Sequence, residues 1–201
     1  MRKKGTLDSL FPTVRAGLLS ATLLQPEHWW YMTELAKHLG VPPSSLQREL
    51  DSLVEAGFLL RRQDGRRIYF KANTESPLFP ELRGIVEKTS GVIPALTTAF
   101  NKFGEKIDVA LIYGSMARAQ EHAGSDIDLM VVGRLQQIDL LPILRKLENR
   151  FRREVNVTLF SPGEFQRRRA AADHFLRSVL KGKTILLKGS LHELENASTN
   201  R

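Results

Sequence analysis

The sequence predicts an α+β protein with a helical N-terminal domain that ends in a β-hairpin and a C-terminal α/β domain with a small mixed sheet. Apolar residues recur at helical spacing in three stretches between residues 10 and 56. Two strand-like runs then meet at Asp64-Gly65, and beyond residue 106 apolar strands alternate with helical patterns. The expected divisions are residues 1–75, a helical connector at 76–91, and residues 92–201.

Composition limits the chemistry and the partners. The 201 residues are 42% hydrophobic and 26% charged, which is typical of a soluble globular protein. The chain contains no cysteine, so disulfides, thiolate nucleophiles and cysteine zinc sites are excluded, and any metal must be held by oxygen. The net charge of +8 favours a polyanionic partner. No apolar run approaches the roughly 18–20 residues that span a bilayer, and no signal-peptide pattern is present, so we expect a cytoplasmic protein.

Three helices are predicted in the N-terminal third. The first covers residues 10–24. The second is Glu34–Leu39, with Thr33 as its N-cap and Gly40 at the position that favours a left-handed backbone. The third follows a tight turn and runs to about Ala56. Two helices joined by about four residues form a helix-turn-helix pattern.

A basic hairpin follows these helices. Residues 58–62 and 66–72 are strand-like, and Asp64-Gly65 between them is a strong hairpin signal. Helices followed by such a hairpin make a winged helix. Its basic side chains, against the single acid Asp64, are Arg61, Arg62, Arg66, Arg67 and Lys71.

The stretch TELAKHLGVPPSSLQRELDSLVEAGFLLRRQDGRRIYFKAN resembles the winged helix-turn-helix of transcriptional regulators of the ArsR and MarR type. The resemblance implies a homodimer on double-stranded DNA, with the third helix in the major groove. The wing arginines would pair with phosphates, which supplies affinity rather than sequence specificity. The metal-sensing function of ArsR proteins is disfavoured because its cysteines are absent. The reading side chains would be Ser44, Ser45, Gln47 and Arg48.

The alternative is that the winged helix binds another protein. A basic hairpin can also be a solvated sheet edge whose charges discourage strand pairing.

A second group of candidate residues lies between two predicted strands, Ile107–Tyr113 and Ile127–Val132. Gly114-Ser115 ends the first strand, and a short helix starts at Met116. A helix N-terminus presents unpaired N–H groups, and glycine lets a phosphate approach the backbone. The turn is therefore a candidate phosphate-binding site.

Asp126 and Asp128 are two residues apart on a strand, so their side chains project to the same face. Neighbouring carboxylates repel each other, which is costly unless a cation lies between them. Magnesium suits such a pair because it takes carboxylates together with water and substrate phosphates. The alternative is that both residues only cap the strand and face solvent.

The motif GSMARAQEHAGSDIDLMVV resembles the signature of the DNA polymerase β-like nucleotidyltransferase superfamily, and most closely its minimal nucleotidyltransferase branch. The resemblance implies a polymerase β-like α/β domain in which catalytic Asp126 and Asp128 bind magnesium. It also implies binding of ATP or another nucleoside triphosphate. The nucleotide would be held by Gly114, Ser115, Arg118 and Ser125.

Two positions depart from that signature. Active members carry a third carboxylate on the strand Glu154–Phe160, where this chain has Asn156. An amide ligates magnesium poorly and cannot accept a proton from the attacking hydroxyl. Glu154 faces the same side but is displaced by about 7 Å along the strand. The smaller departure is Ala119, where the motif usually has glycine.

The sequence thus supports a DNA-binding transcriptional regulator whose second domain binds nucleotide and magnesium, or a partner, with catalysis impaired by Asn156. The alternative is an active minimal nucleotidyltransferase that moves a nucleotide from ATP to a protein or small-molecule hydroxyl, as antitoxins of this branch do on a HEPN-type toxin. A third possibility is an adaptor that uses neither surface chemically.

Overall fold

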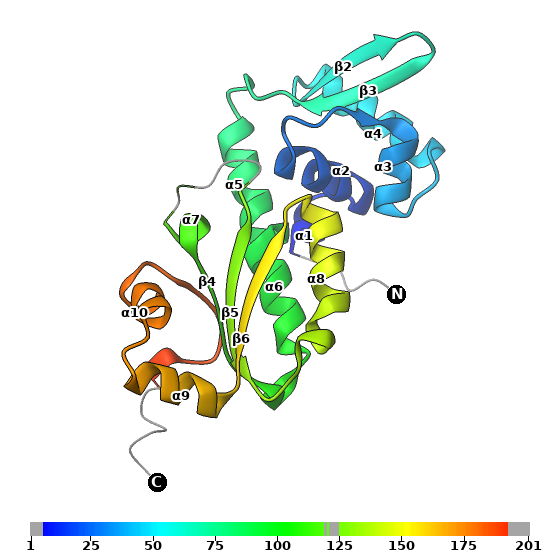
Figure 1. The fold of residues 1–201 in the computed structure, drawn as a ribbon. Coiled ribbons are helices and arrows are strands. Elements are labelled where there is room, and N and C mark those ends of the chain that lie inside the picture. Colours follow the sequence, from blue (N-terminus) through cyan, green and yellow to red (C-terminus); the bar gives the residue numbers. More distant parts are fainter. Residues whose placement is uncertain (1–5, 119, 121–124, 193–201) are drawn as a thin grey trace. The chain divides into compact units, whose positions relative to one another are not determined.

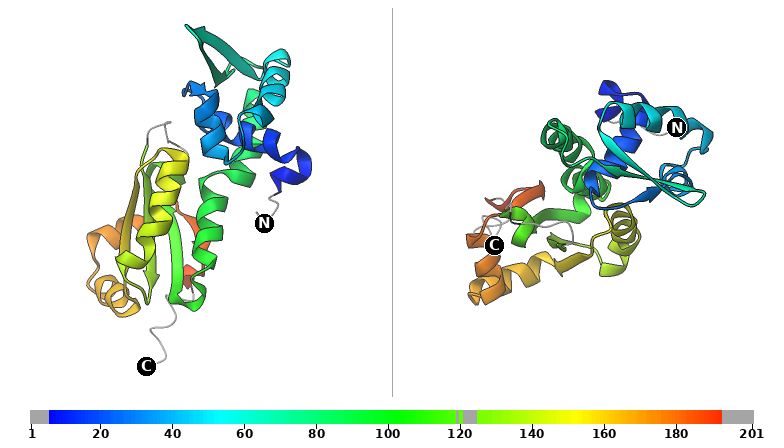
Figure 2. Two further views of the ribbon diagram at one scale, coloured as in Figure 1. Left: turned by 90° about the vertical axis from the view of Figure 1, so that its right-hand side faces the viewer. Right: turned by 90° about the horizontal axis from the view of Figure 1, so that it is seen from above.

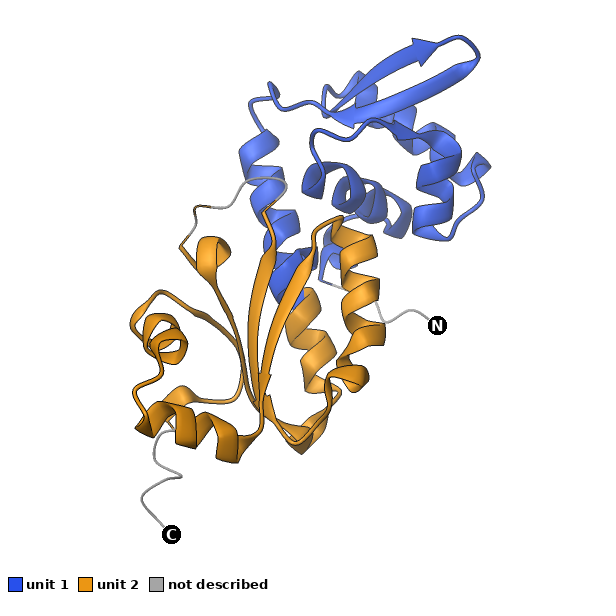
Figure 3. Ribbon diagram, viewed as in Figure 1, with its two compact units in different colours: residues 1–94 blue, residues 95–201 orange. Residues whose placement is uncertain are grey.

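The computed structural model describes residues 6–118, 120 and 125–192. The chain divides into two compact units, Met1–Pro94 and Ala95–Arg201 (Figure 3). Each unit combines helices with a small sheet, so the predicted α+β class is confirmed. None of the helices in the described ranges is long and apolar enough to cross a membrane.

Unit 1 begins with a broken helix. The stretch predicted as one helix over residues 10–24 forms a short helix and a long one, because Phe11 is extended (φ −132°, ψ 150°) ahead of Pro12. A residue that precedes proline is disfavoured in the helical conformation. The helices of this unit are α1 (Leu7–Leu10), α2 (Thr13–Leu24), α3 (Met32–Leu39), α4 (Ser44–Glu55) and α5 (Phe79–Ser90).

The start of α3 differs from the prediction. Thr33 is not its N-cap, because the helix already begins at Met32 and the capping position is Tyr31, in the extended conformation. Tyr31 is extended because Trp30-Tyr31 forms the short strand β1. The predicted end of α3 is confirmed, since Gly40 adopts a left-handed backbone with φ 67°.

The predicted hairpin is present. Strands β2 (Leu59–Asp64) and β3 (Arg67–Ala72) pair antiparallel, and Gly65 in the turn has φ 58°. β1 adds to the free side of β3, which gives the strand order β1-β3-β2. Figure 1 shows the β2–β3 hairpin. The helix-turn-helix and the three-stranded wing therefore form the winged helix expected from the sequence.

The core of unit 1 joins all of these elements. Trp30 and Phe70 from the sheet are buried with leucines of α2, α3 and α4, such as Leu50. Val86 from α5 belongs to the same core, so residues 79–90 pack within this unit.

Unit 2 is built on a four-stranded mixed sheet of order β6-β5-β4-β7. β4 pairs antiparallel with β5 and β7, whereas β5 and β6 are parallel. The strands are β4 (Ile107–Tyr113), β5 (Ile127–Gly133), β6 (Val155–Phe160) and β7 (Ile185–Lys188).

Helices cover both faces of this sheet. Figures 1 and 2 show α6 and α8 on one face and α9 and α10 on the other. Phe165 of α9 and Leu176 of α10 pack into one core with alternate residues of β4 and β5, such as Leu111 and Met130. The helices are α6 (Val92–Asn101), α7 (Gly114–Ala117), α8 (Gln137–Phe151), α9 (Pro162–Ala170) and α10 (His174–Lys181), with a 3-10 turn at Gly104–Lys106.

Candidate functional site

The candidate site lies where β4 ends and where β5 and β6 begin. Asp128 of β5 is paired with Tyr113 of β4 on one side and with Asn156 of β6 on the other. Paired residues share a face of the sheet, and Met130, two residues beyond Asp128, belongs to the core under α9 and α10. The three side chains therefore form a row on the face that carries α9 and α10.

Gly114 and Asp128 are in close contact. A Cβ atom added to Gly114 would lie 2.3 Å from Oδ2 of Asp128, and the glycine backbone has φ +77°. Both facts exclude a larger residue without a local rearrangement. The structure thus brings the predicted glycine turn directly against one of the two predicted aspartates.

Asn156 stands beside the other aspartate. Its Nδ2 donates a hydrogen bond to Oδ2 of Asp126 over 3.4 Å. Two carboxylates and one amide are hard donors suited to a magnesium-like cation, but this set carries one charge fewer than three carboxylates. Among the described residues there is no group of three acidic or histidine side chains that could hold a metal ion, so Glu154 does not complete such a group. The residues present fit a weakly held cation on Asp126 and Asp128.

Arg153 holds the backbone of Ser125 and Asp126, the two residues that precede β5. Its Nε donates to the carbonyl oxygen of Ser125 over 2.5 Å, and its Nη2 lies 3.4 Å from the carbonyl oxygen of Asp126. Sequence reasoning missed this residue. Its only sequence signal is its position directly before the predicted strand Glu154–Phe160.

The remaining candidate nucleotide ligands surround the one-turn helix α7. Ser115 is half-buried, and its carbonyl oxygen accepts hydrogen bonds from the backbone N–H groups of Arg118 and Gln120. The exposed Arg118 donates from Nε to Oε1 of Gln120. Ser125 is half-buried beside Asp126. The departure at Ala119 lies outside the described residues.

On the predicted reading helix, α4, all four candidate side chains are exposed. Gln47 donates to the carboxylate of Asp51 one turn further on, over 2.9 Å. Asp51 also lies 3.7 Å from Arg61 of the wing. Acidic Asp51 therefore engages one reading residue and one wing residue, whereas Ser44, Ser45 and Arg48 project from the helix without such a constraint in the described contacts.

Strand alternation divides the wing cations between two faces. Arg61 pairs in register with the buried Phe70, so it faces the same side as the core and α4. Arg62 pairs in register with Tyr69 on the opposite face. There its guanidinium lies 4.6 Å from the ring centroid of Trp29 and 5.5 Å from that of Tyr69.

Two further cations occupy this outer face. The guanidinium of Arg67 lies 5.8 Å from the ring of Tyr31, and Nζ of Lys71 lies 2.7 Å from Oε2 of Glu27. A side-chain hydrogen bond with Tyr69, followed by Coulomb attraction to Tyr69 and Tyr31, raises the pKa of Arg67 above its ordinary value. Arginine is charged at physiological pH without any such shift, so the two tyrosines orient the guanidinium and do not change its charge.

Two family models match the chain. The model of the polymerase beta nucleotidyltransferase family matches residues 95–189. The model of the IclR helix-turn-helix domain matches residues 25–63. No curated protein matches the sequence significantly.

Several solved structures are similar to parts of this chain. A mutant MntA-HpeT toxin–antitoxin is 15% identical, with a TM-score of 0.40 over 54% of this chain and 82% of that chain. The tri-AMPylated Shewanella oneidensis HEPN toxin in complex with its MNT antitoxin is 16% identical, with a TM-score of 0.33 over 52% and 78%. NolR from Sinorhizobium fredii is 21% identical, with a TM-score of 0.30 over 46% and 99%.

The family matches coincide with the two parts of the chain described above. Residues 25–63 comprise α3, α4 and most of β2, and residues 95–189 comprise the whole four-stranded sheet. Residues 25–63 thus form a helix-turn-helix domain of the IclR type, and residues 95–189 form a nucleotidyltransferase domain of the polymerase beta family.

Proposed function

We propose that this protein is a DNA-binding transcriptional regulator whose nucleotidyltransferase domain binds a nucleoside triphosphate and magnesium but transfers the nucleotide poorly. The family matches support both halves, because a helix-turn-helix domain binds DNA and the second domain belongs to a nucleotide-handling family. A cytoplasmic location and a homodimer on duplex DNA belong to this proposal.

The observation that carries the proposal is the hydrogen bond from Asn156 to Asp126. Asp126 and Asp128 are the side chains that would hold the cation, which would neutralise charge on the phosphates when bound. Gly114 has no side chain to collide with the carboxylate of Asp128, so the glycine turn and this carboxylate lie together. Asn156 offers a neutral amide at the third position, and it cannot take the proton of an attacking hydroxyl. Binding of the cation and the nucleotide is therefore retained, whereas removal of the proton from the attacking hydroxyl is lost.

The test compares wild type with Asp128→Asn and Asn156→Asp in a thermal-shift titration with ATP and magnesium. ATP at about 100 times its dissociation constant should stabilise the wild type by roughly 2.7 kcal/mol. Asp128→Asn should remove most of this stabilisation. Asn156→Asp should keep it and add turnover of radiolabelled ATP. Absence of stabilisation in wild type would refute nucleotide binding.

The intact contact between Gly114 and Asp128 favours a second candidate, an active transferase that modifies a protein or small-molecule hydroxyl. A HEPN-type toxin is one possible protein acceptor to test. Labelled ATP with magnesium or manganese should then label the acceptor, and Asp128→Asn should abolish the label. Wild-type labelling at the rate of Asn156→Asp would establish this candidate and exclude impairment by Asn156.

A further inference from the structure

The outer face of the wing sheet carries aromatic rings and a guanidinium side by side. Phe70 of β3 is buried in the core of unit 1, so its neighbour Tyr69 points to the opposite, outer face. Tyr31 of β1 and Arg62 of β2 are paired in register with Tyr69 on its two sides. One row across the three strands therefore holds two rings and one cation.

The side chains of this row are close together and open to solvent. The ring centroids of Tyr31 and Tyr69 are 5.7 Å apart, with their planes at 45°. The guanidinium of Arg62 contacts Tyr69 and also the ring of Trp29, which lies beside the row. All three rings are only half-buried, and Arg62 is exposed. The row thus presents π surface and positive charge together on one face of the sheet.

The acidic residues of this face lie outside the row. Glu27 pairs with Lys71, and Asp64 is opposite Arg67 at the hairpin turn. Arg62 forms no ion pair with any of the described residues. A guanidinium that stacks on rings keeps its N–H groups for an anion. Arg62 is therefore the cation of this face best suited to a phosphate.

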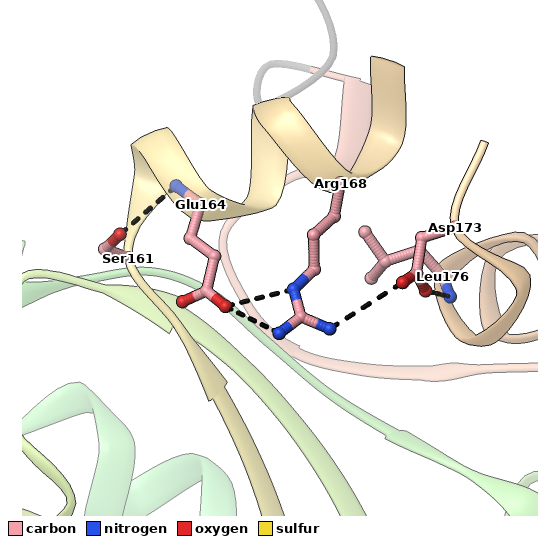
Figure 4. A network of polar contacts seen from close by, with 5 residues as sticks. All are labelled: Ser161, Glu164, Arg168, Asp173 and Leu176. Atoms are coloured by element: carbon pink, nitrogen blue, oxygen red, sulfur yellow. Dashed lines mark hydrogen bonds and ion pairs between the residues drawn. The ribbon is translucent and has the colours of Figure 1, made fainter. Parts of the chain in front are cut away.

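A cation beside a ring is not sufficient for such a surface, as Arg168 of α9 shows. Its guanidinium lies 5.2 Å from the ring centroid of Phe160. Phe160 is buried, however, and Arg168 lies 2.9 Å from the carboxylate of Glu164 and 3.7 Å from that of Asp173 (Figure 4). That pair offers no open ring, and its charge is already neutralised. The row on the wing differs in both respects.

We propose that the outer face of the wing binds single-stranded nucleic acid, with unpaired bases stacked on Tyr31 and Tyr69 and a phosphate on Arg62. Aromatic side chains bind unpaired bases of any sequence because every base has a π-face. In a duplex the bases stack on one another, so their faces do not reach a sheet. This activity goes beyond the proposed reading of duplex DNA by α4, and it does not depend on the nucleotide site of unit 2.

Fluorescence anisotropy of the full-length protein with a labelled oligothymidylate of about 12 nucleotides tests this proposal. Tyr31→Leu/Tyr69→Leu should bind about tenfold or more weakly, because leucine keeps apolar bulk but has no π-face. Tyr31→Phe/Tyr69→Phe restores both rings and should bring the affinity back to within about twofold of wild type. No binding to wild type, or equal affinities of wild type and the leucine variant, would overturn the proposal.

A second pair of variants tests the face without changing a ring. Arg62→Gln should lower the slope of log affinity against log salt concentration by about 0.7, the contribution of one phosphate of a single strand. Arg61→Gln is the matched control, because the neighbouring Arg61 faces the core side and lies 3.7 Å from Asp51. It should change the slope much less. Equal changes in the two variants would overturn the proposal, and this pair decides alone if the leucine variant does not fold.

A duplex of the same length separates a failure here from a failure of the proposed function. If the leucine variant loses affinity equally for duplex and single strand, the face does not select unpaired bases and this proposal is overturned. If wild type binds the single strand but no duplex, the proposed regulator is wrong and this proposal stands. Oligouridylate distinguishes the two sources of single strands: tighter binding than oligothymidylate assigns the face to RNA, and weaker binding assigns it to DNA.

Discussion

At the scale of single residues, the candidate site depends on one glycine that leaves space for a carboxylate. We predict that Gly114→Ala lowers the free energy of unfolding by about 1–3 kcal/mol, because alanine is strained at φ +77°. It should also remove part of the roughly 2.7 kcal/mol stabilisation by ATP and magnesium, because its Cβ would displace Asp128. Thermal-shift titration measures this. Gly163→Ala is the control, since nothing lies within 4 Å of a Cβ there and its φ is not positive. An unchanged ATP shift in Gly114→Ala would show that Asp128 does not bind the cation.

Arg153 is a positioning residue for the same site. Its guanidinium holds the backbone carbonyls of Ser125 and Asp126 just before the aspartate strand. Removing a charged donor from such hydrogen bonds costs about 1.5–3 kcal/mol. We predict that Arg153→Ala weakens ATP binding about tenfold or more by calorimetry, with partial rescue by Arg153→Lys. Arg145→Ala, an exposed arginine of α8, should have no effect. A lower melting temperature with normal ATP affinity would assign Arg153 a purely structural role.

The sequence could identify Gly114, Asp126 and Asp128 because they lie close together in one motif. It could also single out Asn156, but not its hydrogen bond to Asp126, thirty residues away. That contact depends on the register of β6 against β5, and so do the hydrogen bonds that Arg153 donates to the carbonyl oxygens of Ser125 and Asp126. Register depends on packing and on connections that are distant in the chain, so the local pattern of one strand does not predict it.

At the scale of elements, the wing also contains pairing that the local sequence pattern does not predict. The local signal Asp64-Gly65 predicts the β2–β3 hairpin. The two-residue strand β1 has no pattern of its own, because it exists only by pairing with β3. The pairing of β1 with β3 places Trp30 in the core and Tyr31 on the outer face beside Tyr69. The hairpin arginines looked equivalent in the sequence, although the sheet divides them between two faces.

This division predicts different roles for two wing arginines. Arg66 is exposed at the hairpin turn, whereas Arg61 lies 3.7 Å from Asp51. Each phosphate contact adds about 0.9 to the slope of log affinity against log salt concentration. We predict that Arg66→Gln lowers this slope by about 0.9, and that Arg61→Gln changes it much less because Asp51 already neutralises that charge. Fluorescence anisotropy with a labelled random-sequence duplex measures both. Equal slope changes would mean that DNA breaks the pair between Arg61 and Asp51.

At the scale of the whole molecule, two domains were predicted, and two family matches lie in the corresponding parts of the chain. Helix α5 is instructive. Its sequence looked like a connector because a turn-rich break precedes it, yet Val86 completes the core of unit 1. An amphipathic helix between two domains carries no local signal of which core takes its apolar face.

The two cores give a final prediction. Both tryptophans, Trp29 and Trp30, are in unit 1, so intrinsic fluorescence reports the unfolding of that unit, whereas far-UV circular dichroism reports both units. Leu50 of α4 and Leu129 of β5 are fully buried, and a leucine-to-alanine change in a core costs about 2–5 kcal/mol. Multidomain proteins often unfold in more than one step. We therefore expect Leu50→Ala to lower the denaturant midpoint seen by fluorescence. Leu129→Ala should shift the circular dichroism transition and leave the fluorescence midpoint unchanged. A common shift of both signals in both variants would show that the units unfold as one cooperative body.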